Sequence, residues 1–234
     1  MTAPTISKDS RTIRGMFGVI APRYDLLNHL LSFNTDKRWR KRAVRLAAPA
    51  GPVLDVCTGT GDLAAEFAET IGQPVAGVDF CRPMLERGQA KKECGAVRFL
   101  QGDAQALPFP ADHFDVVSVG FGLRNVQDPR RGLAEFVRVA RPGGRVAVLE
   151  FTSPKNPVFR ALYNIYFRAV LPFIGNAVSR SRAYSYLNRS VVAWKNEDEL
   201  SAMMREAGCE TVAIHPLTFG IAAVHLGRKA VANG

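Results

Sequence analysis

The 234-residue chain has few cysteines and no long apolar segment. Its four cysteines, Cys57, Cys81, Cys94 and Cys209, form no C-x-x-C pair. This spacing argues against a disulfide scaffold, a redox motif and a zinc site, so we expect no metal and a reducing compartment. No apolar run is long and charge-free enough to span a bilayer, and residues 1–15 lack the apolar core of a secretory signal. We therefore expect a cytoplasmic protein.

Acidic residues are absent from one long segment. Residues 151–196 carry seven basic residues and no Asp or Glu, and residues 1–51 carry ten basic and three acidic residues. These two segments account for the formal charge of +10, since the rest of the chain is slightly acidic. Residues 151–196 also hold nine of the 21 aromatic residues. Such a segment fits a nucleic-acid surface, an anionic lipid surface or an amphipathic cap over the protein's own core.

Short apolar runs alternate with helical patterns along the middle of the chain, and hydrophobic residues make up 47% of it. The predicted strands are 53–56, 74–78, 97–100, 114–119 and 145–151, and the helices between them are 62–71, 84–92 and 129–140. A helix over 196–207 and two antiparallel strands, 211–215 and 221–226, complete the pattern. We therefore predict a Rossmann-like α/β fold with a seven-stranded, mostly parallel sheet and an antiparallel C-terminal edge strand.

Breaks in this pattern predict the domain organisation. Residues 1–51 read as an N-terminal helical extension that ends at Gly51-Pro52. Residues 52–234 form the α/β domain, in which Pro154 and Pro157 introduce a helical insertion over 154–194.

The first predicted strand runs into a glycine turn, and glycine lets a ligand approach the backbone closely. Gly59 and Gly61, with Ala64, even satisfy the G-x-G-x-x-A dinucleotide pattern, so a nicotinamide-dependent oxidoreductase is one alternative. Asp55 lies just before the turn, where a carboxylate would repel a pyrophosphate. Asp79 ends the second strand, at the position that binds a ribose diol. Two acids beside the turn favour a cationic nucleoside such as S-adenosylmethionine.

Two further segments are candidates for ligand contacts. Asp103 and Ala104 follow the third strand, where a carboxylate and backbone groups suit an adenine amine. Arg124 and Asn125 follow the fourth strand, at the end of the sheet where ligands bind in such folds.

Several motifs together resemble the class I methyltransferases. They are D-V-C-T-G-T-G-D at 55–62, the strand end at Asp79, G-D-A-x-x-L-P-F at 102–109, F-D-V-V at 114–117 and R-P-G-G-R at 141–145. More narrowly, G-F-G-L-R-N-V at 120–126 resembles the quinone C-methyltransferases of menaquinone and ubiquinone biosynthesis. Y-D-x-x-N at 24–28, S-F at 32–33, K-R-W-R at 37–40, Y-S-Y-L-x-x-S at 184–190 and T-F-G-I-A-A-V-H at 218–225 resemble them too. The likeness runs from about Met16 to Lys229.

The resemblance implies cofactor binding by Thr60, Asp79, Asp103 and Ala104, beside the candidates Asp55, Gly59 and Gly61. The ubiquinone branch usually has a serine where this chain has Gly120, so no side-chain role is transferred to that position. The likeness is greater to the menaquinone branch, whose substrate is a demethylmenaquinol. The alternative is C-methylation of 2-polyprenyl-6-methoxy-1,4-benzoquinol.

The implied reaction moves a methyl group from a sulfonium to a ring carbon beside a quinol hydroxyl. It needs the reacting atoms about 3–3.5 Å apart and a positive group near the phenolate oxygen. We expect Arg124 to supply that charge, because a guanidinium stays protonated. Asn125 would orient the oxygen or a water, and Tyr184 and Tyr186 would complete the hydrogen bonds over the ring. No general base is predicted.

A polyprenyl substrate implies contact with a membrane. The basic, aromatic segment 151–196 and the basic stretch 37–45 fit a peripheral contact with anionic lipid at the inner face of the cell membrane, each charge adding about 1 kcal/mol. An RNA methyltransferase, with the same charges contacting phosphates, is a further alternative, although we expect no nucleic-acid partner. The oligomeric state, including a homo-oligomer, is left open.

Overall fold

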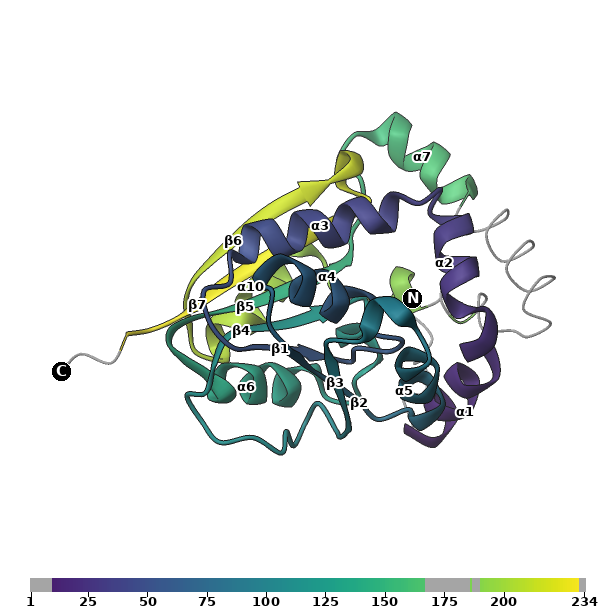
Figure 1. The fold of residues 1–234 in the computed structure, drawn as a ribbon. Helices are drawn as coiled ribbons and strands as arrows, with labels where there is room; N and C mark the ends of the chain where they lie inside the picture. Colours follow the sequence, from purple (N-terminus) through teal and green to yellow (C-terminus); the bar gives the residue numbers. More distant parts are fainter. Residues whose placement is uncertain (1–9, 167–185, 187–189, 232–234) are drawn as a thin grey trace.

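The computed structural model describes residues 10–166, 186 and 190–231. These residues form one seven-stranded sheet in the order β3-β2-β1-β4-β5-β7-β6 (Figure 1). The strands are β1 (Val53–Val56), β2 (Val75–Asp79), β3 (Val97–Gln101), β4 (Phe114–Gly120), β5 (Ala140–Phe151), β6 (Cys209–Leu217) and β7 (Ala222–Lys229). The fold agrees with the predicted Rossmann-like architecture.

The C-terminal strands refine one detail of the prediction. β7 is antiparallel to both β5 and β6, as expected of a hairpin. It lies between them, however, so that β6 and not β7 forms the edge of the sheet. The two sequences explain this order, because β7 begins with four buried residues. β6 has no such run and contains Pro216, which an edge strand tolerates.

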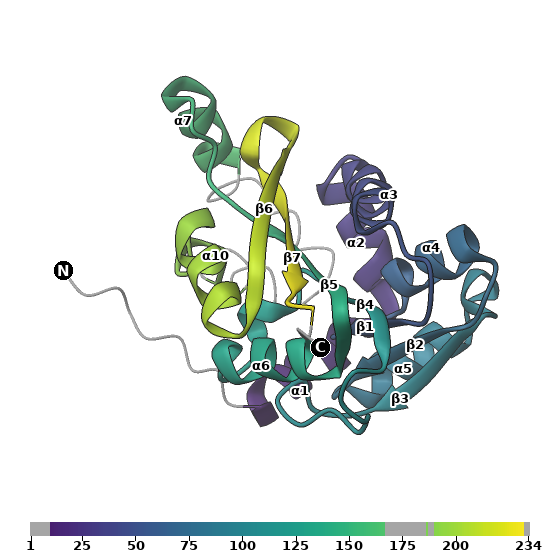
Figure 2. The ribbon, with the colours of Figure 1, turned by 90° about the vertical axis from the view of Figure 1, so that its left-hand side faces the viewer.

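Helices cover both faces of the sheet (Figure 2). The α-helices are α1 (Ser10–Ile20), α2 (Tyr24–Leu31), α3 (Thr35–Ala47), α4 (Asp62–Ile71), α5 (Arg82–Gln89), α6 (Pro129–Val139), α7 (Pro157–Ile165) and α10 (Glu197–Glu206). Short 3-10 turns are η1 (Ala21–Arg23), η2 (Lys92–Cys94), η3 (Leu123–Asn125) and η5 (Thr218–Gly220). None of the helices in the described part of the chain is long and apolar enough to cross a bilayer.

Alternate residues of the central strands pack into two separate cores. Leu54 and Val117 face α6 and α10, whereas Val53 and Val116 face α3 and α4. This alternation follows from the two-residue repeat of a strand. A strand whose two faces are both covered is buried along its whole length, which is what β1 and most of β4 show.

The carboxyl ends of the strands position the candidate site. The strand order reverses between β1 and β4, the point where ligands bind in open α/β sheets. α1 and α2 lie at this end of the sheet, where Phe17 and Tyr24 line a cavity together with residues that follow β4. Pro22 in η1 interrupts the two helices, as the sequence predicts. Most of the predicted insertion lies outside the described residues.

Candidate active site

Asp79, the last residue of β2, is held by backbone donors. Its Oδ2 accepts a hydrogen bond from the N–H of Gly59 at 2.8 Å, and its Oδ1 accepts one from the N–H of Cys81 at 2.8 Å. Burial raises the pKa of this carboxyl to about 6, although the backbone hydrogen bonds from Cys81 and Gly59 lower it. Gly59 has a φ of 58°, which glycine adopts without strain. The turn and the acid therefore hold each other in place.

Asp79 lines a cavity of about 170 Å³ at the carboxyl ends of β1, β2 and β4. Four of the predicted cofactor residues line it: Gly59, Asp79, Asp103 and Ala104. Gly102, Gly120 and Gly122 also line it, so four of its lining residues carry no side chain. The predicted residues Asp55, Thr60 and Gly61 are not among the described residues of this wall.

Asp55 is directed toward neighbouring hydroxyl groups. It accepts hydrogen bonds from Thr58 Oγ1 and Ser118 Oγ, both at 2.7 Å. Burial raises its pKa to about 7, against the lowering effect of those two hydroxyls. In this structure Asp55 links β1, the glycine turn and β4, and its contact with a cofactor stays a prediction.

Thr60 and Gly61 connect the turn to other elements. Thr60 Oγ1 donates to Asp25 Oδ1 of α2 at 2.5 Å. Gly61 has a φ of 85°, and a Cβ there would lie 2.6 Å from the ring of Phe99, so a side chain would clash. Thr60 is thus engaged with α2, and Gly61 packs closely against β3. Their contacts with a cofactor stay predictions.

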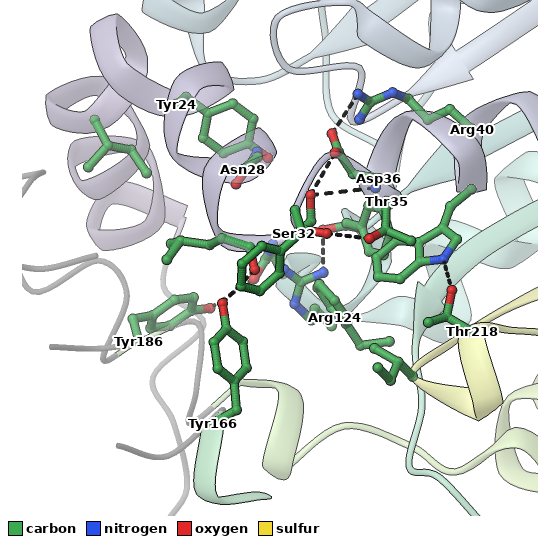
Figure 3. Close-up of a pocket in the computed structure, with 18 of the residues that line it drawn as sticks. Tyr24, Asn28, Ser32, Thr35, Asp36, Arg40, Arg124, Tyr166, Tyr186 and Thr218 are labelled. Atoms are coloured by element: carbon green, nitrogen blue, oxygen red, sulfur yellow. Dashed lines mark hydrogen bonds and ion pairs between the residues drawn. The ribbon is translucent and has the colours of Figure 1, made fainter. Parts of the chain in front are cut away.

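A second, larger cavity of about 290 Å³ lies next to the first, between α1, α2, α3 and the ends of β4 and β5 (Figure 3). Aromatic and aliphatic side chains make up much of its wall, namely Met16, Phe17, Ile20, Tyr24, Leu31, Phe33, Trp39, Phe121, Phe151, Tyr163, Tyr166, Tyr186 and Ile221. The polar residues are Asn28, Ser32, Thr35, Asp36, Arg40, Arg124, Asn125 and Thr218. An apolar pocket with a few polar groups is typical of a site for a hydrophobic organic ligand.

Arg124 reaches this cavity from the turn after β4. It is only 5% exposed and forms an ion pair with the fully buried Glu150 of β5, with 2.9 Å between Nη1 and Oε2. Nη1 also donates to the carbonyl of Phe121. Arg124 Nε is buried and has no hydrogen-bond partner in the described part of the chain. A buried donor without a partner is costly, and the protein leaves this guanidinium incompletely satisfied.

Asn125 lies beside Arg124 and lines both cavities. Its side-chain oxygen accepts a hydrogen bond from the Tyr186 hydroxyl at 3.2 Å. The structure therefore brings together three of the predicted substrate residues, Arg124, Asn125 and Tyr186. Tyr184, the third predicted catalytic residue, lies outside the described residues.

Four side chains separate the two cavities and line both of them: Phe17, Tyr24, Phe121 and Asn125. Burial raises the pKa of the Tyr24 hydroxyl, which is therefore protonated at neutral pH. Tyr24 has no role among the sequence-based predictions, although the motif Y-D-x-x-N contains it. Glu150 was likewise missed, because nothing in an apolar strand sequence shows that its carboxylate meets an arginine.

The polar end of the larger cavity belongs to a charged network. Asp36 accepts hydrogen bonds from Ser32 Oγ at 2.6 Å and Arg40 Nη2 at 2.7 Å, and its Oδ2 lies 2.7 Å from His29 Nδ1. Burial alone would raise the pKa of Asp36, but the hydrogen bond from Ser32 and the charge of Arg40 outweigh it and lower the pKa. This carboxylate therefore stays ionised.

The same network ties the N-terminal helices to the sheet domain. Arg40 also lies 3.2 Å from Asp62 at the start of α4, and Lys91 pairs with both Asp62 and Asp25. His29, Asp36 and Asp62 form a group of three side chains of the types that bind metals. Since Arg40 and Lys91 already neutralise its carboxylates, we assign no metal to it.

Comparison with known proteins identifies relatives along nearly the whole chain. The sequence model of the ubiE/COQ5 methyltransferase family matches residues 5–229. A demethylmenaquinone methyltransferase from Thermus thermophilus is 50% identical over 220 residues, which cover 92% of this chain and all of the relative. The ubiquinone/menaquinone biosynthesis C-methyltransferase UbiE from Geobacter sulfurreducens is 43% identical over 98% of this chain and 93% of its own length.

Solved structures show the same fold at much lower sequence identity. A SAM-dependent methyltransferase from Thermotoga maritima has a TM-score of 0.62 at 21% identity, covering 90% of this chain and 98% of its own. A methyltransferase from Methanococcus maripaludis has a TM-score of 0.64 at 14% identity, covering 100% of this chain and 99% of its own. These likenesses support the class I methyltransferase fold predicted from the sequence.

Proposed function

The chain belongs to the ubiE/COQ5 methyltransferase family, and on that premise we propose that it methylates a ring carbon of a polyprenylated quinol with S-adenosylmethionine as the donor. Demethylmenaquinol is the favoured acceptor. The observation that carries the proposal is the pair of adjoining cavities, one acidic and rich in glycine, the other largely apolar, with Phe17, Tyr24, Phe121 and Asn125 common to both. Nothing in the comparisons supports an oxidoreductase.

The smaller cavity fits S-adenosylmethionine. The buried Asp79 uses one lone pair of each oxygen for Gly59 and Cys81 and keeps the others, so it can accept the ribose hydroxyls. Asp103 and Ala104 would hold the adenine, and the bare turn at Gly59 leaves room for the amino-acid portion. When bound, the cofactor supplies an electrophilic methyl group on a sulfonium.

The larger cavity fits the quinol. Its aromatic side chains would surround the quinol rings and the start of the prenyl tail. Arg124 is a buried cation that lines the same cavity. A ring carbon beside a hydroxyl becomes nucleophilic when the hydroxyl loses its proton, and Arg124 would stabilise the resulting oxyanion with its guanidinium charge. Asn125, with Tyr186 on its oxygen, would orient the same oxygen or a water.

Glu150 and Asp36 would have supporting roles in this mechanism. Glu150 fixes the guanidinium of Arg124 from the side of β5 and compensates its buried charge before the oxyanion forms. Asp36, held ionised by Ser32 and Arg40, supplies a charge-balanced hydrogen-bonding group at the polar end of the cavity. Substitution at carbon releases one ring proton per turnover, and Asp36 and His29 provide hydrogen-bonding groups on a route from that end toward solvent.

The acceptor quinol and the membrane contact belong to the same proposal. The Thermus thermophilus relative favours a demethylmenaquinol, and Gly120 departs from the serine usual in the ubiquinone branch. The exposed basic residues of α3, Lys37, Arg38, Lys41, Arg42 and Arg45, support peripheral contact with anionic lipid at the inner face of the cell membrane.

A labelled-methyl assay tests the acceptor. Purified protein is given S-adenosylmethionine with a labelled methyl group and either demethylmenaquinol or the methoxy-benzoquinol precursor of ubiquinone. We expect label chiefly in menaquinol, whereas faster labelling of the benzoquinol would move the assignment to ubiquinone biosynthesis. Calorimetry with S-adenosylmethionine and NADH supplies the second criterion, because binding of NADH alone would overturn the assignment.

A further inference from the structure

Two phenylalanines are exposed in an unusual backbone conformation. Phe33 is 77% exposed and Phe219 is 80% exposed, the two highest values among the large apolar residues that the structure describes. Phe33 has a φ of 52° and Phe219 a φ of 57°, in the left-handed region that bulky residues rarely adopt. Such strain persists where the surrounding structure imposes it, and it is concentrated at functional sites. The fold therefore holds both aromatic rings in water at an energetic cost.

Both residues belong to segments that line the larger cavity. The exposed Phe33 lines it directly, and Phe219 is flanked by Thr218, which also lines it. Trp39 Nε1 donates to Thr218 Oγ1 at 2.8 Å and so anchors η5 to α3. The Tyr166 hydroxyl donates to the carbonyl of Leu31 at 2.7 Å, and both residues line the cavity. Both ribbon views show η5, α7 and the beginning of α3 at one end of the molecule (Figures 1 and 2).

The surroundings of the two phenylalanines combine apolar and basic groups. Leu26 and Leu30, one helical turn apart on α2, are more than half exposed, as are Val158 and Ile165 on α7. Phe159 of α7 lies 5.1 Å from Phe219, measured between ring centroids. The exposed basic residues Lys37 and Arg38 begin α3 a few positions after Phe33. Exposed apolar side chains bordered by basic residues match the layered chemistry of an anionic bilayer surface.

We propose that Phe33 and Phe219 insert together into the interfacial layer of an anionic bilayer, which places the opening of the quinol cavity against the membrane. The inference rests on the proposed function, since it requires a lipid-soluble substrate. The quinol head group then enters the cavity directly from the bilayer, while its prenyl tail stays in lipid. The basic start of α3 contacts the lipid phosphates beside the two rings.

Asparagine variants test this without damaging the fold. Asparagine tolerates positive φ, so Phe33→Asn and Phe219→Asn relieve backbone strain and should not lower the melting temperature. In sedimentation with phosphatidylglycerol and phosphatidylcholine vesicles, we expect each variant to bind about tenfold more weakly than the wild type, and the double variant more weakly still. Val231→Asn is the matched control, because Val231 is also exposed, at 57%, but lies near the C-terminus. It should bind like the wild type.

Activity supplies a second readout with the single variant Phe219→Asn, whose side chain does not line the cavity. With a short-chain, water-soluble demethylmenaquinol its kcat/KM should equal that of the wild type, and with a long-chain quinol in vesicles it should fall about tenfold. Unchanged vesicle binding by the double variant would overturn the membrane-insertion proposal. Failure of the wild type to methylate even the short-chain quinol would instead contradict the proposed function, and vesicle binding would still decide the insertion.

Discussion

Arg124 and Glu150 form a buried ion pair between the turn after β4 and the end of β5, with 2.9 Å between Nη1 and Oε2. Glu150 is completely buried and Arg124 nearly so. Each buried charge compensates the other, so removing one partner leaves an uncompensated charge in the protein interior. Their arrangement means that the cation expected to act on the substrate also has a structural partner, so loss of activity and loss of stability must be measured separately.

Replacing Arg124 alone should affect both properties. Arg124→Ala should lower turnover by at least about 10²–10³-fold, because the oxyanion loses its cation. It should also destabilise the fold by about 3–5 kcal/mol, because Glu150 is left buried without a counter-charge. Affinity for S-adenosylmethionine, measured by calorimetry below the melting temperature, should stay close to that of the wild type. A collapse of that affinity would contradict the assigned role.

The paired variant Arg124→Met with Glu150→Leu separates the two effects. Removing both charges with side chains of similar volume is often neutral for stability, so urea unfolding should return close to the wild-type value. Turnover should remain abolished. Activity recovered together with stability would show that Arg124 acts only through the fold.

Asp79 should be required for cofactor binding in a way that Asp55 is not. Asp79→Asn replaces an oxygen that accepts from a backbone N–H by an amide group that donates, and a backbone N–H cannot reverse its role. We expect affinity for S-adenosylmethionine to fall about 10–100-fold in calorimetry. Asp55→Asn is the matched control, because its partners Thr58 and Ser118 are hydroxyls that can turn and accept instead. Comparable losses in both variants would contradict this distinction.

Cofactor affinity should depend on pH through Asp79. The pKa of its carboxyl is raised to about 6 in the free protein, and the ionised form is the one that accepts two ribose hydroxyls. Affinity should therefore be flat above about pH 7 and fall by up to about tenfold per pH unit below about pH 6. Calorimetry across this range measures the effect, and Asp55→Asn should preserve it. A profile that rises toward low pH would contradict the assignment.

Ionisation of Asp55 should lower the free energy of unfolding as the pH rises from 3.8 to about 7. Its folded-state pKa is raised to about 7 from an unfolded value of 3.8. The folded state therefore binds more protons between these two values, and this contribution to stability is lost as pH rises through that window. Asp55→Asn removes the effect, so the free energy of unfolding of the wild type should decline relative to that of the variant, by up to about 1.4 kcal/mol for each pH unit within the window. Parallel curves for the two proteins in urea unfolding across this pH range would contradict the raised pKa.

The charged network should hold α2 over the glycine turn. Asp25→Asn weakens the links from α2 to Thr60 and Lys91, and we expect about 1–3 kcal/mol of destabilisation with faster amide exchange in α1 and α2. Arg82→Ala, which removes an exposed ion pair with Glu86, is the control and should cost less than about 0.5 kcal/mol. Equal amide exchange rates of α1 and α2 in the two variants would show that the network does not hold these helices in place.

Sequence reasoning worked best where structure is local. The strand at 53–56 and the helix at 62–71 have the predicted bounds. Asp79 and Gly59 lie together because they lie at and just after the ends of two adjacent parallel strands, β2 and β1. The directions of Asp55 and Thr60 were not predictable, since they depend on hydroxyl and carboxyl partners from β4 and α2. Glu150, Tyr24 and Asp36 reach the site through packing between distant segments. A glycine motif reports backbone shape, whereas a cavity wall is assembled by the whole fold.

The most direct measurement compares reduced and oxidised acceptor in the presence of S-adenosylmethionine carrying a labelled methyl group. If Arg124 activates the ring by stabilising a quinol oxyanion, label should enter menaquinol from reduced demethylmenaquinol and be absent from the oxidised demethylmenaquinone. Equal labelling of both forms, or no labelling of the reduced form by protein that binds S-adenosylmethionine, would contradict the account.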